Sequence, residues 1–510
     1  MKKRGRSGKV GKVILVGAGP GDPGLLTLRG REALRRAEVV IFDALVNPEI
    51  LSLAETAEKI FAGKKAGRHL IEQERIHQML LQFARQGKRI VRLKGGDPFI
   101  FGRGGEEASF LVRHRVPFEV IPGVSAGIGA AATAGIPLTD RRFTSHVTFV
   151  TGHCGKGEVD WKKLSETGGT LVAFMGLKTL PQIVRALLRA GRKPRTPAAV
   201  IEQGTLPAQR VISGTLENIL EKVKKANVIP PALTVVGDVV GLGKKLAWFS
   251  RKPLQGKKVI VTRPRGQAGE LVEKLGDLGA EVLEFPTIEI LPPSRPDRID
   301  REIQRMAAAV KPVYDWLVFT SANGVESFFD RMRCLGKDGR IFSGLRIAAI
   351  GERTAETLQK KGLWADLIPG EYTNEALFES LKKRGPLQGK KFLLARVASP
   401  PPELKESLEK EGALVTELET YRTRPVKAER KKLIQTLQSG KIDYVTFTSS
   451  STVRNFFDPL PPALRRRLRT RFISIGPVTS GTLREYGFKP AREARMHTTE
   501  GILEALSNGG

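Results

Sequence analysis

The residues best suited to chemistry lie in one glycine-rich stretch, RLKGGDPFIFGRGGEEASFL, which runs from Arg92 to Leu111. It follows the β-branched pair Ile90 and Val91 and leads into a helical pattern, which predicts a loop between a strand and a helix. Glycine lets a ligand approach the backbone, Asp97 adds a carboxylate, and Pro98 limits the freedom of the turn. An isolated Gly-Gly pair would indicate only a turn with positive φ. Five glycines in these 20 residues, with charged side chains between them, indicate a binding loop.

Two charged residues outside this stretch could also take part in chemistry. Asp43 directly follows the strand-like segment Val39–Phe42. Carboxylates at the carboxyl ends of parallel strands point into a ligand crevice, so Asp43 is a candidate base, although an Asp at this position could equally cap a helix. Lys64, in the segment AGKKAGRH, could meet an anionic substrate or could be an ordinary surface lysine.

The first apolar strand, Val13–Val16, runs into the turn GAGPGDPGLLTLRG. This turn resembles a nucleotide-binding loop but departs from the dinucleotide fingerprint, because Asp22 stands at the third glycine position. Pro20 also removes an amide that could donate to a phosphate. The turn therefore favours a ligand without phosphate.

The elements that must position these residues belong to a long globular chain. Its 510 residues, 40% of them hydrophobic, are enough for roughly three or four domains, and the alternation of strand and helix patterns predicts an α/β architecture. The two cysteines, Cys154 and Cys334, form no disulfide or zinc pattern, and we predict no metal site. The basic start precedes a strand pattern and the apolar run at 120–138 is broken by prolines, so we expect a cytoplasmic protein without a membrane segment.

The formal charge of +32 favours either nucleic acid or a strongly anionic small substrate. The lysines and arginines are scattered, and no zinc-finger, helix-turn-helix or aromatic-interleaved RNA motif accompanies them. Charge alone does not choose between these two kinds of partner, and for most of the lysines and arginines we expect a solvated basic surface. Without such a motif, no nucleic acid is expected.

The motifs of roughly the first 245 residues occur in the order VGAGPGDPGLLT, FDALV, GKKAG, GGDPFIFGRGGEE, IPGVSA, AFMG and AAVIEQGTLPAQRVISGTL. Together they resemble the uroporphyrinogen-III C-methyltransferases, a family that uses S-adenosyl-L-methionine to methylate uroporphyrinogen III twice, giving precorrin-2 for sirohaem and cobalamin synthesis. The resemblance implies that Asp43 is a proton acceptor and Lys64 a proton donor. It also implies a homodimer, and because the methylase strand begins by Val13, no dehydrogenase or ferrochelatase activity is expected. The cofactor would be held by Pro20, Gly95, Gly96, Asp97, Ile100, Ser125, Ala126, Met175 and Gly204.

The second half of the chain contains an internal repeat. TSANGVESFF at 320–329 matches TSSSTVRNFF at 448–457, and IGERTAETL at 350–358 matches IGPVTSGTL at 475–483. A third pair begins at Val259 and Phe392 and reads as strand, helix and strand in both copies. Two similar α/β lobes are implied.

These features resemble uroporphyrinogen-III synthase, which closes hydroxymethylbilane with inversion of its last pyrrole ring and has two Rossmann-like or flavodoxin-like lobes. The resemblance implies a proton-donor role for Tyr421. Serine and threonine after a strand are also ordinary helix caps, so the remaining matching residues have two interpretations. These cleft residues are Thr320, Ser321, Asn323, Gly351, Thr354, Ser449, Ser450, Gly476 and Thr479.

We therefore predict a bifunctional tetrapyrrole enzyme in which a two-lobed methylase precedes a two-lobed synthase. The alternatives are a related methylase that acts on another corrinoid or on RNA, and a tetrapyrrole-binding scaffold with an inactive synthase half. The predicted boundaries are 1–245 for the methylase (lobes 10–122 and 123–245), 246–256 for a linker, and 257–510 for the synthase (lobe one 257–290 plus 424–510, lobe two 291–423).

Overall fold

The computed structural model describes residues 10–63, 73–152, 159–263, 265–426 and 430–507. The chain divides into two compact units, one made of Met1–Lys257 with Gly276–Glu281 and one made of Lys258–Leu275 with Val282–Gly510. Each unit contains two five-stranded sheets. The mixed α/β architecture confirms the predicted fold class.

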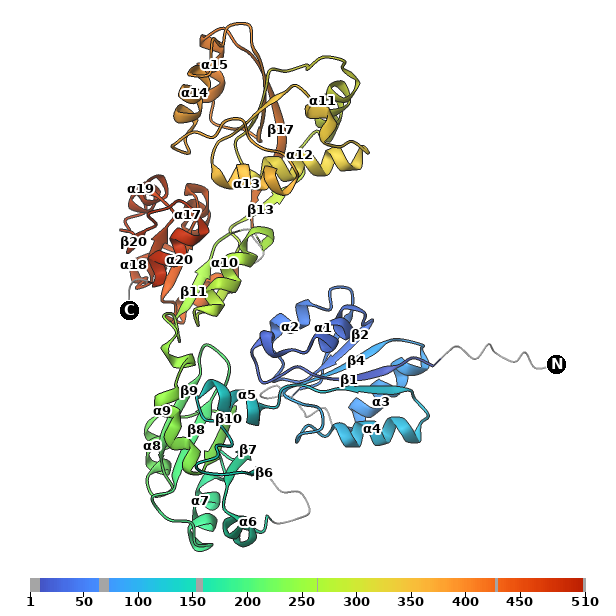
Figure 1. Ribbon diagram of the computed structural model, residues 1–510, viewed down its shortest axis with the longest axis vertical. Helices are drawn as coiled ribbons and strands as arrows, with labels where there is room; N and C mark the ends of the chain where they lie inside the picture. The colour runs from blue at the N-terminus through green and yellow to red at the C-terminus, as the bar shows by residue number, and fades with distance from the viewer. Residues whose placement is uncertain (1–9, 64–72, 153–158, 264, 427–429, 508–510) are drawn as a thin grey trace, which may run out of the picture. The chain divides into compact units, whose positions relative to one another are not determined.

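The first sheet of the first unit has the order β3-β2-β4-β1-β5, and all of its strands are parallel. One core, including Leu80 and Leu111, lies under α3 and α4, and a second core, including Leu34 and Ile50, lies under α1 and α2. The helices therefore cover both faces of the sheet (Figure 1). Its elements are β1 (Val13–Gly17), α1 (Leu28–Arg35), β2 (Val39–Phe42), α2 (Pro48–Ser52), β3 (Glu58–Phe61), α3 (Gln73–Arg85), β4 (Ile90–Lys94), α4 (Gly104–Arg113) and β5 (Phe118–Ile121).

The second sheet of this unit, β6-β7-β10-β8-β9, is mixed. Only β6 and β7 are parallel, while β10, β8 and β9 pair in antiparallel fashion. Its elements are α5 (Ala126–Thr133), β6 (Val147–Thr151), α6 (Trp161–Thr167), β7 (Thr170–Phe174), α7 (Leu180–Arg189), β8 (Pro197–Glu202), β9 (Arg210–Thr215), α8 (Ile219–Lys225) and β10 (Ala232–Val236). The segment after β10 forms short helical turns at η2 (Asp238–Leu242), α9 (Gly243–Leu246) and η3 (Phe249–Arg251).

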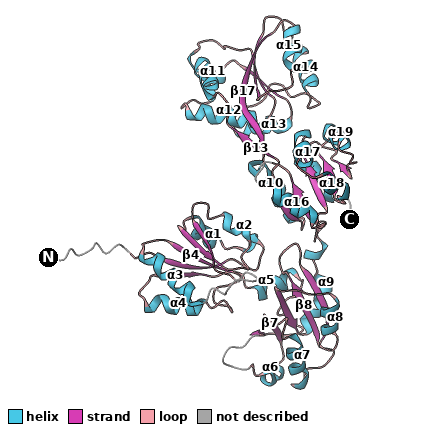
Figure 2. Cartoon of the chain, turned by 180° about the vertical axis from the view of Figure 1, so that it is seen from behind, coloured by secondary structure: helices cyan, strands magenta, loops and turns pink. Residues whose placement is uncertain are grey.

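The second unit carries the two copies of the repeat on two sheets, β12-β11-β18-β19-β20 and β13-β17-β16-β14-β15. The long strand β17 pairs in parallel with β16. It also pairs in antiparallel fashion with β13, and both of these strands are labelled in Figure 2. The first sheet and its helices comprise β11 (Lys258–Val261), α10 (Arg265–Asp277), β12 (Glu281–Glu284), α16 (Arg430–Gln438), β18 (Tyr444–Phe447), α17 (Ser450–Phe457), α18 (Pro462–Arg467), β19 (Arg471–Ser474), α19 (Pro477–Glu485), β20 (Arg492–Glu493) and α20 (Thr499–Ser507). The second comprises β13 (Ile288–Leu291), α11 (Pro296–Ala308), β14 (Trp316–Phe319), α12 (Ala322–Cys334), β15 (Arg346–Ala349), α13 (Glu352–Lys360), α14 (Asn374–Lys382), β16 (Lys391–Val397), α15 (Glu403–Lys410) and β17 (Leu414–Pro425).

Candidate functional site

Three glycine-containing loops meet at the carboxyl ends of β1, β4 and β5. Gly19 and Gly96 exchange two backbone hydrogen bonds, of 3.1 and 2.7 Å. A Cβ on Gly123 would lie 2.3 Å from the carbonyl oxygen of Gly96 and 2.7 Å from the Cα of Gly17. The loops are therefore packed backbone against backbone, and only glycine fits at position 123.

Asp97 ties two of these loops together. Its Oδ1 accepts a hydrogen bond of 2.8 Å from the amide of Phe99, and its Oδ2 accepts one of 3.0 Å from the amide of Gly123. Both carboxylate oxygens thus hold backbone in place. Asp97 shapes the site through these bonds, while its direct contact with a cofactor stays a prediction.

Helix α5 joins the loops of the two lobes. Ser125 is its N-cap, and its side chain accepts from the amide of Gly127 at 3.4 Å. A Cβ on Gly129 would lie 2.7 Å from Pro20 Cγ, and a Cβ on Gly204 would lie 2.3 Å from that of Ala130. The small residues of α5 therefore bring the predicted positions Pro20, Ser125, Ala126 and Gly204 to one place.

The backbone face of Gly96 is open toward this helix. A Cβ at that position would meet only the amide nitrogen of Ala126, at 3.7 Å, and Gly96 has a φ of 68°. A bound molecule could occupy the space that a side chain would fill. This cradle fits a flat ligand held by backbone groups.

Unusual backbone conformations gather around the same loops. Phe101 and Met175 have positive φ angles of 51°, and Gln203 and Thr205 have φ angles of 52° and 71°. Such conformations are sparsely populated for residues with a Cβ and occur often at ligand sites. Met175 is 51% exposed and Ile100 is 39% exposed, so both predicted apolar contacts are accessible.

Asp43 follows β2 at the same edge of the sheet, as predicted. Its Oδ1 accepts a hydrogen bond of 2.5 Å from Arg92 Nη2, and its Oδ2 lies 3.8 Å from Lys94 Nζ. Its side chain is 30% exposed, whereas those of Arg92 and Lys94 are buried. The predicted proton donor Lys64 lies outside the described residues.

Arg92, Lys94 and Glu107 were missed as site residues by sequence reasoning. One signal was present: Arg92 and Lys94 alternate with apolar residues in β4, whose five positions are all buried. In a sheet covered on both faces, a buried cation needs a buried partner. The sequence alone does not identify that partner as Glu107.

A further hollow of about 590 Å³ is lined by the loop 139–145. Arg142 donates two side-chain hydrogen bonds of 2.9 Å to Asp140, and these bonds hold the pKa of Asp140 at about 2. The adjacent Arg141 adds a second positive charge to the loop. Because Arg142 and Asp140 form an ion pair, the net positive charge of this hollow comes from Arg141.

In the second unit, the predicted serine and glycine positions begin helices. Ser321 and Ser449 are the N-caps of α12 and α17, and Gly351 and Gly476 stand at the same position of α13 and α19. Because β14 and β15 are parallel, as are β18 and β19, the helix starts of each lobe lie at one sheet edge. The other predicted positions follow within these turns and first helical residues: Thr320, Asn323, Thr354, Ser450 and Thr479.

The repeat also places two buried arginines at matching positions. Arg263 and Arg396 each stand four residues after the start of their copies, Val259 and Phe392. Arg263 donates to Thr499 Oγ1 at 2.9 Å, and Arg396 donates to Glu417 Oε1 at 2.9 Å. The aligned repeat was the signal that could have identified them.

Tyr421 lies in β17 and is 7% exposed. Its backbone carbonyl accepts a hydrogen bond of 2.8 Å from Ala398, just beyond β16. Tyr421 is therefore buried in the sheet, and its role as a proton donor stays a prediction.

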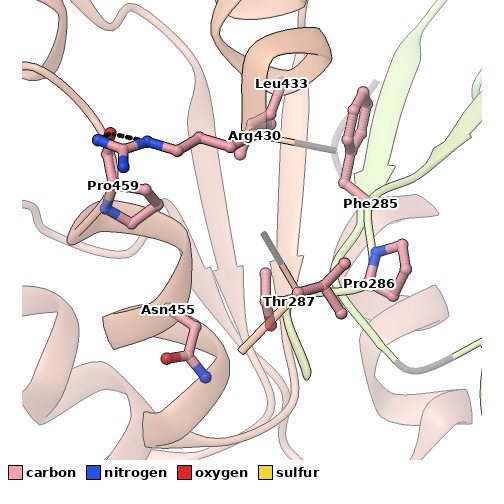
Figure 3. A pocket seen from close by; sticks show the side chains of 8 residues that line it. Phe285, Pro286, Thr287, Arg430, Leu433, Asn455 and Pro459 are labelled. Atoms are coloured by element: carbon pink, nitrogen blue, oxygen red, sulfur yellow. Dashed lines mark hydrogen bonds between the residues drawn. The ribbon is translucent and has the colours of Figure 1, made fainter. Parts of the chain in front are cut away.

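A small cavity elsewhere in this unit does not match a tetrapyrrole (Figure 3). Its volume is about 20 Å³, room for a single water. Arg430 at its wall donates to the carbonyl of Pro459 at 2.8 and 3.0 Å. This cavity is a packing gap beside α16.

Introducing a negative charge at Ser449, the N-cap of α17, tests whether this residue only caps the helix or also binds carboxylates of the substrate. We expect Ser449→Asp to keep the cap, because aspartate caps as well as serine, but to raise KM for an acidic substrate about tenfold by repulsion. Steady-state kinetics with the acidic linear tetrapyrrole that the resemblance implies as substrate measures this. Thr373→Asp is the matched control, since Thr373 caps α14 in the same unit by accepting from Ala376 at 3.1 Å. Equal KM values for Ser449→Asp and Thr373→Asp would show that Ser449 caps the helix and does not bind the substrate.

Among the described residues, no group of three or more histidine, cysteine, aspartate or glutamate side chains is arranged to hold a metal ion. Within the same residues, no helix combines the length and apolar character needed to cross a bilayer.

Two family models match the chain. "Tetrapyrrole (Corrin/Porphyrin) Methylases" matches residues 12–220, and "Uroporphyrinogen-III synthase HemD" matches residues 269–504. The "Porphyrin biosynthesis protein HemD" of Ruminiclostridium josui is 36% identical over 500 residues, covering 97% of this chain and 97% of that protein. The "Uroporphyrinogen-III C-methyltransferase" of Bacillus subtilis is 38% identical and covers 71% of this chain and 74% of its own length.

A solved structure of the uroporphyrin-III C-methyl transferase of Thermus thermophilus, complexed with S-adenyl homocysteine, is 44% identical to this chain. The match covers 46% of this chain and 100% of the chain in that structure, with a TM-score of 0.41. The chain spans about half the length of the curated siroheme synthases that it matches. For the siroheme synthase of Pseudomonas paraeruginosa, the match covers 52% of that protein.

Proposed function

The chain belongs to the family of tetrapyrrole biosynthesis enzymes that fuse a tetrapyrrole methylase to a uroporphyrinogen-III synthase, and from this premise we propose that it makes precorrin-2 from hydroxymethylbilane. The carboxyl-terminal unit closes hydroxymethylbilane to uroporphyrinogen III with inversion of the last ring. The amino-terminal unit then adds two methyl groups from S-adenosyl-L-methionine. We propose residues 1–245 as the methylase and 257–510 as the synthase, joined by 246–256.

The observation that carries the methylase proposal is the cradle formed by the glycine loops and α5. It has an open backbone face at Gly96, the accessible apolar side chains of Ile100 and Met175, and Pro20 where a phosphate-binding turn would offer an amide. These features fit a cofactor with an adenosine and a methionine part and no phosphate. The cofactor supplies a methyl group on a positively charged sulfur.

The residues of this chain then have two tasks in methyl transfer. The loops align an electron-rich ring carbon with the methyl group, because an in-line displacement depends on orientation more than on reactive side chains. The new carbon–carbon bond leaves the macrocycle with a positive charge, which the loss of a ring proton relieves. The Asp43 carboxylate accepts that proton, and Lys64 returns a proton where the ring rearrangement requires one.

In the synthase unit, the four helix starts act on the acidic side chains of the substrate. Helices α12, α13, α17 and α19 begin at Ser321, Gly351, Ser449 and Gly476. Free amides at helix N-termini favour anions, so these turns position the linear tetrapyrrole by its carboxylates. Pyrrole electrons expel the terminal hydroxyl group, and Tyr421 supplies the proton with which it leaves as water.

The scattered positive charge of the chain has a partner in these substrates, both of which carry several carboxylates. A homodimer through the methylase unit and a cytoplasmic location complete the proposal. The bifunctional assignment places two consecutive reactions on one polypeptide.

Two separate assays of the full chain test the proposal. Anaerobic uroporphyrinogen III with S-adenosyl-L-methionine is expected to gain two methyl groups by mass, and hydroxymethylbilane alone is expected to give the type III isomer by chromatography. Unmethylated uroporphyrinogen III would remove the methylase assignment. A type I product, which arises from spontaneous closure, would remove the synthase assignment.

A further inference from the structure

A buried cluster of charges lies behind Asp43. Glu107, in α4, is completely buried, and its Oε1 accepts hydrogen bonds from three donors. These donors are Arg92 Nε at 3.1 Å, Lys94 Nζ at 3.0 Å and Gln73 Nε2 at 3.1 Å. One carboxylate oxygen thus organises side chains from α3 and β4. The other oxygen, Oε2, has no hydrogen-bond partner among the described residues.

Arg92 connects Glu107 to the candidate base. Its Nε faces Glu107 and its Nη2 faces Asp43, while Nη1 lies 3.4 Å from the carbonyl oxygen of Ile41 and 3.5 Å from that of Leu93. All three nitrogens of the planar guanidinium are therefore engaged. A guanidinium held in this way fixes the Oδ1 of Asp43 in one position.

Lys94 faces both carboxylates. Its Nζ is hydrogen-bonded to Glu107 and lies 3.8 Å from Asp43 Oδ2, beyond hydrogen-bond length. Oδ2 is thus the oxygen of Asp43 that can receive a proton, close to a positive charge but without a short bond to it. Asp43 is the most exposed member of the cluster, since the side chains of Arg92, Lys94 and Glu107 are 2%, 3% and 0% exposed.

The charges in this cluster affect one another strongly. Burial acts to raise the pKa of Glu107, but the positive charges of Arg92 and Lys94 outweigh burial and lower it. Burial lowers the pKa of Lys94, and Arg92 lowers it further. Other charged groups nearby are Glu106, which is paired with Arg103, and His77, which lies 3.6 Å from Glu74. His77 lies in α3 and Glu106 lies in α4, and each pairs with a residue three positions earlier in the sequence.

Four charges are more than a structural contact between β4 and α4 requires. Burying an ion costs several kcal/mol of folding free energy. Hydrophobic residues of similar volume in place of a buried ion pair often leave the fold equally stable or more stable. With two carboxylates and two cations, the cluster is formally neutral, and its only partly exposed group is the candidate base. A neutral, rigid set of charges is a means of fixing the orientation of that base.

We propose that Glu107, acting through Arg92 and Lys94, is a positioning residue that fixes the orientation of the Asp43 carboxylate for methyl transfer and balances the two cations beside it. This role rests on the proposed methylase function. It gives α4, whose first turn belongs to the glycine-rich loop, a direct electrostatic connection to the base at the end of β2.

Two substitutions of opposite sign test the role through the pH dependence of methyl transfer by the full chain. Glu107→Gln removes a negative charge and leaves two cations beside Asp43, so the acid limb of kcat/KM is expected to move down by about one pH unit. Lys94→Met removes a positive charge, and the same limb is expected to move up by about one unit. Either variant alone is informative if the other does not fold.

Two controls accompany these variants. Glu119→Gln removes a negative charge from β5, where Glu119 pairs with Lys12 at 2.6 Å and also with Arg29, and is expected to keep the wild-type profile. Equilibrium binding of S-adenosylhomocysteine is expected to stay within about twofold in every folded variant. Glu107→Asp, which keeps the charge but shortens the side chain, is expected to retain the wild-type pH midpoint at a lower kcat.

An acid limb that stays at the wild-type pH in both charge-changing variants, whatever their rates, would overturn the positioning role. Failure of the proposed function is a different result: the wild-type chain would then transfer no methyl group to uroporphyrinogen III at any pH.

Discussion

Gly123→Ala is expected to abolish methyl transfer and to weaken S-adenosylhomocysteine binding by about 100-fold or more. The added Cβ would lie 2.3 Å from the carbonyl oxygen of Gly96 and 2.7 Å from the Cα of Gly17. No flexible side chain can move aside, because both neighbours are backbone. The loops must separate, and displacements of about 1 Å can cost 100-fold in rate. Calorimetric binding and initial rates measure the two effects.

Gly105→Ala is the matched control for this change. A Cβ at Gly105 would meet nothing within 4 Å, and the residue lies in the first turn of α4, within the same glycine-rich stretch. Alanine is favoured over glycine in a helix, so stability is expected to rise by up to about 1 kcal/mol with unchanged binding. Unchanged binding in Gly123→Ala as well would show that the meeting of the three loops does not form the cofactor site.

Asp43→Asn is expected to lower kcat for methyl transfer by about 100- to 10,000-fold while S-adenosylhomocysteine binding stays unchanged. The amide oxygen of asparagine can still accept from Arg92, so the side chain keeps its place. It can no longer take up a proton in the working pH range. Single-turnover rates beside equilibrium binding separate the two effects.

An exposed aspartate elsewhere in the unit serves as the comparison. Asp238→Asn, at the start of η2, makes the same chemical change on the surface and is expected to keep the wild-type rate. If Asp43→Asn loses binding and rate in equal measure, Asp43 has a structural role, and if it loses neither, the base lies elsewhere.

Much of the first sheet and its loops could be predicted from the sequence. The apolar runs at β1, β2 and β4 end in glycine or aspartate, and residues that follow parallel strands gather at one edge. This local signal predicts that the loops holding Pro20, Gly96 and Asp43 lie at one edge of the sheet, whereas the roles of these residues come from the family resemblance and stay predictions. The predicted positions within the repeat begin helices for the same reason, because serine and threonine after a strand satisfy free amides.

The buried cluster could not be predicted in this way. Arg92 and Glu107 lie 15 positions apart, and their contact depends on how α4 packs on β4. The glutamate pair at the start of α4 gives no sign of which member turns inward: Glu107 is buried, while Glu106 is exposed and paired with Arg103. Only the tertiary packing distinguishes them.

The antiparallel pairing in the sheet β6-β7-β10-β8-β9 also could not be predicted from the sequence pattern. β8 and β9 are separated by a short turn that contains Gln203 and Thr205 at positive φ, which non-glycine residues seldom adopt. The same turn delivers Thr205 Oγ1 to the amide of Asp22 at 3.1 Å, a link between the two lobes of this unit. Hydrophobic alternation predicts strands but not this pairing.

The most direct measurement is an anaerobic reaction of the purified full chain with hydroxymethylbilane and S-adenosyl-L-methionine, with products resolved by isomer and by methyl count. A dimethylated type III product is predicted, since it requires ring inversion by one unit and two methyl transfers by the other. A product with only the type I skeleton, or a type III product without methyl groups, would contradict the bifunctional assignment.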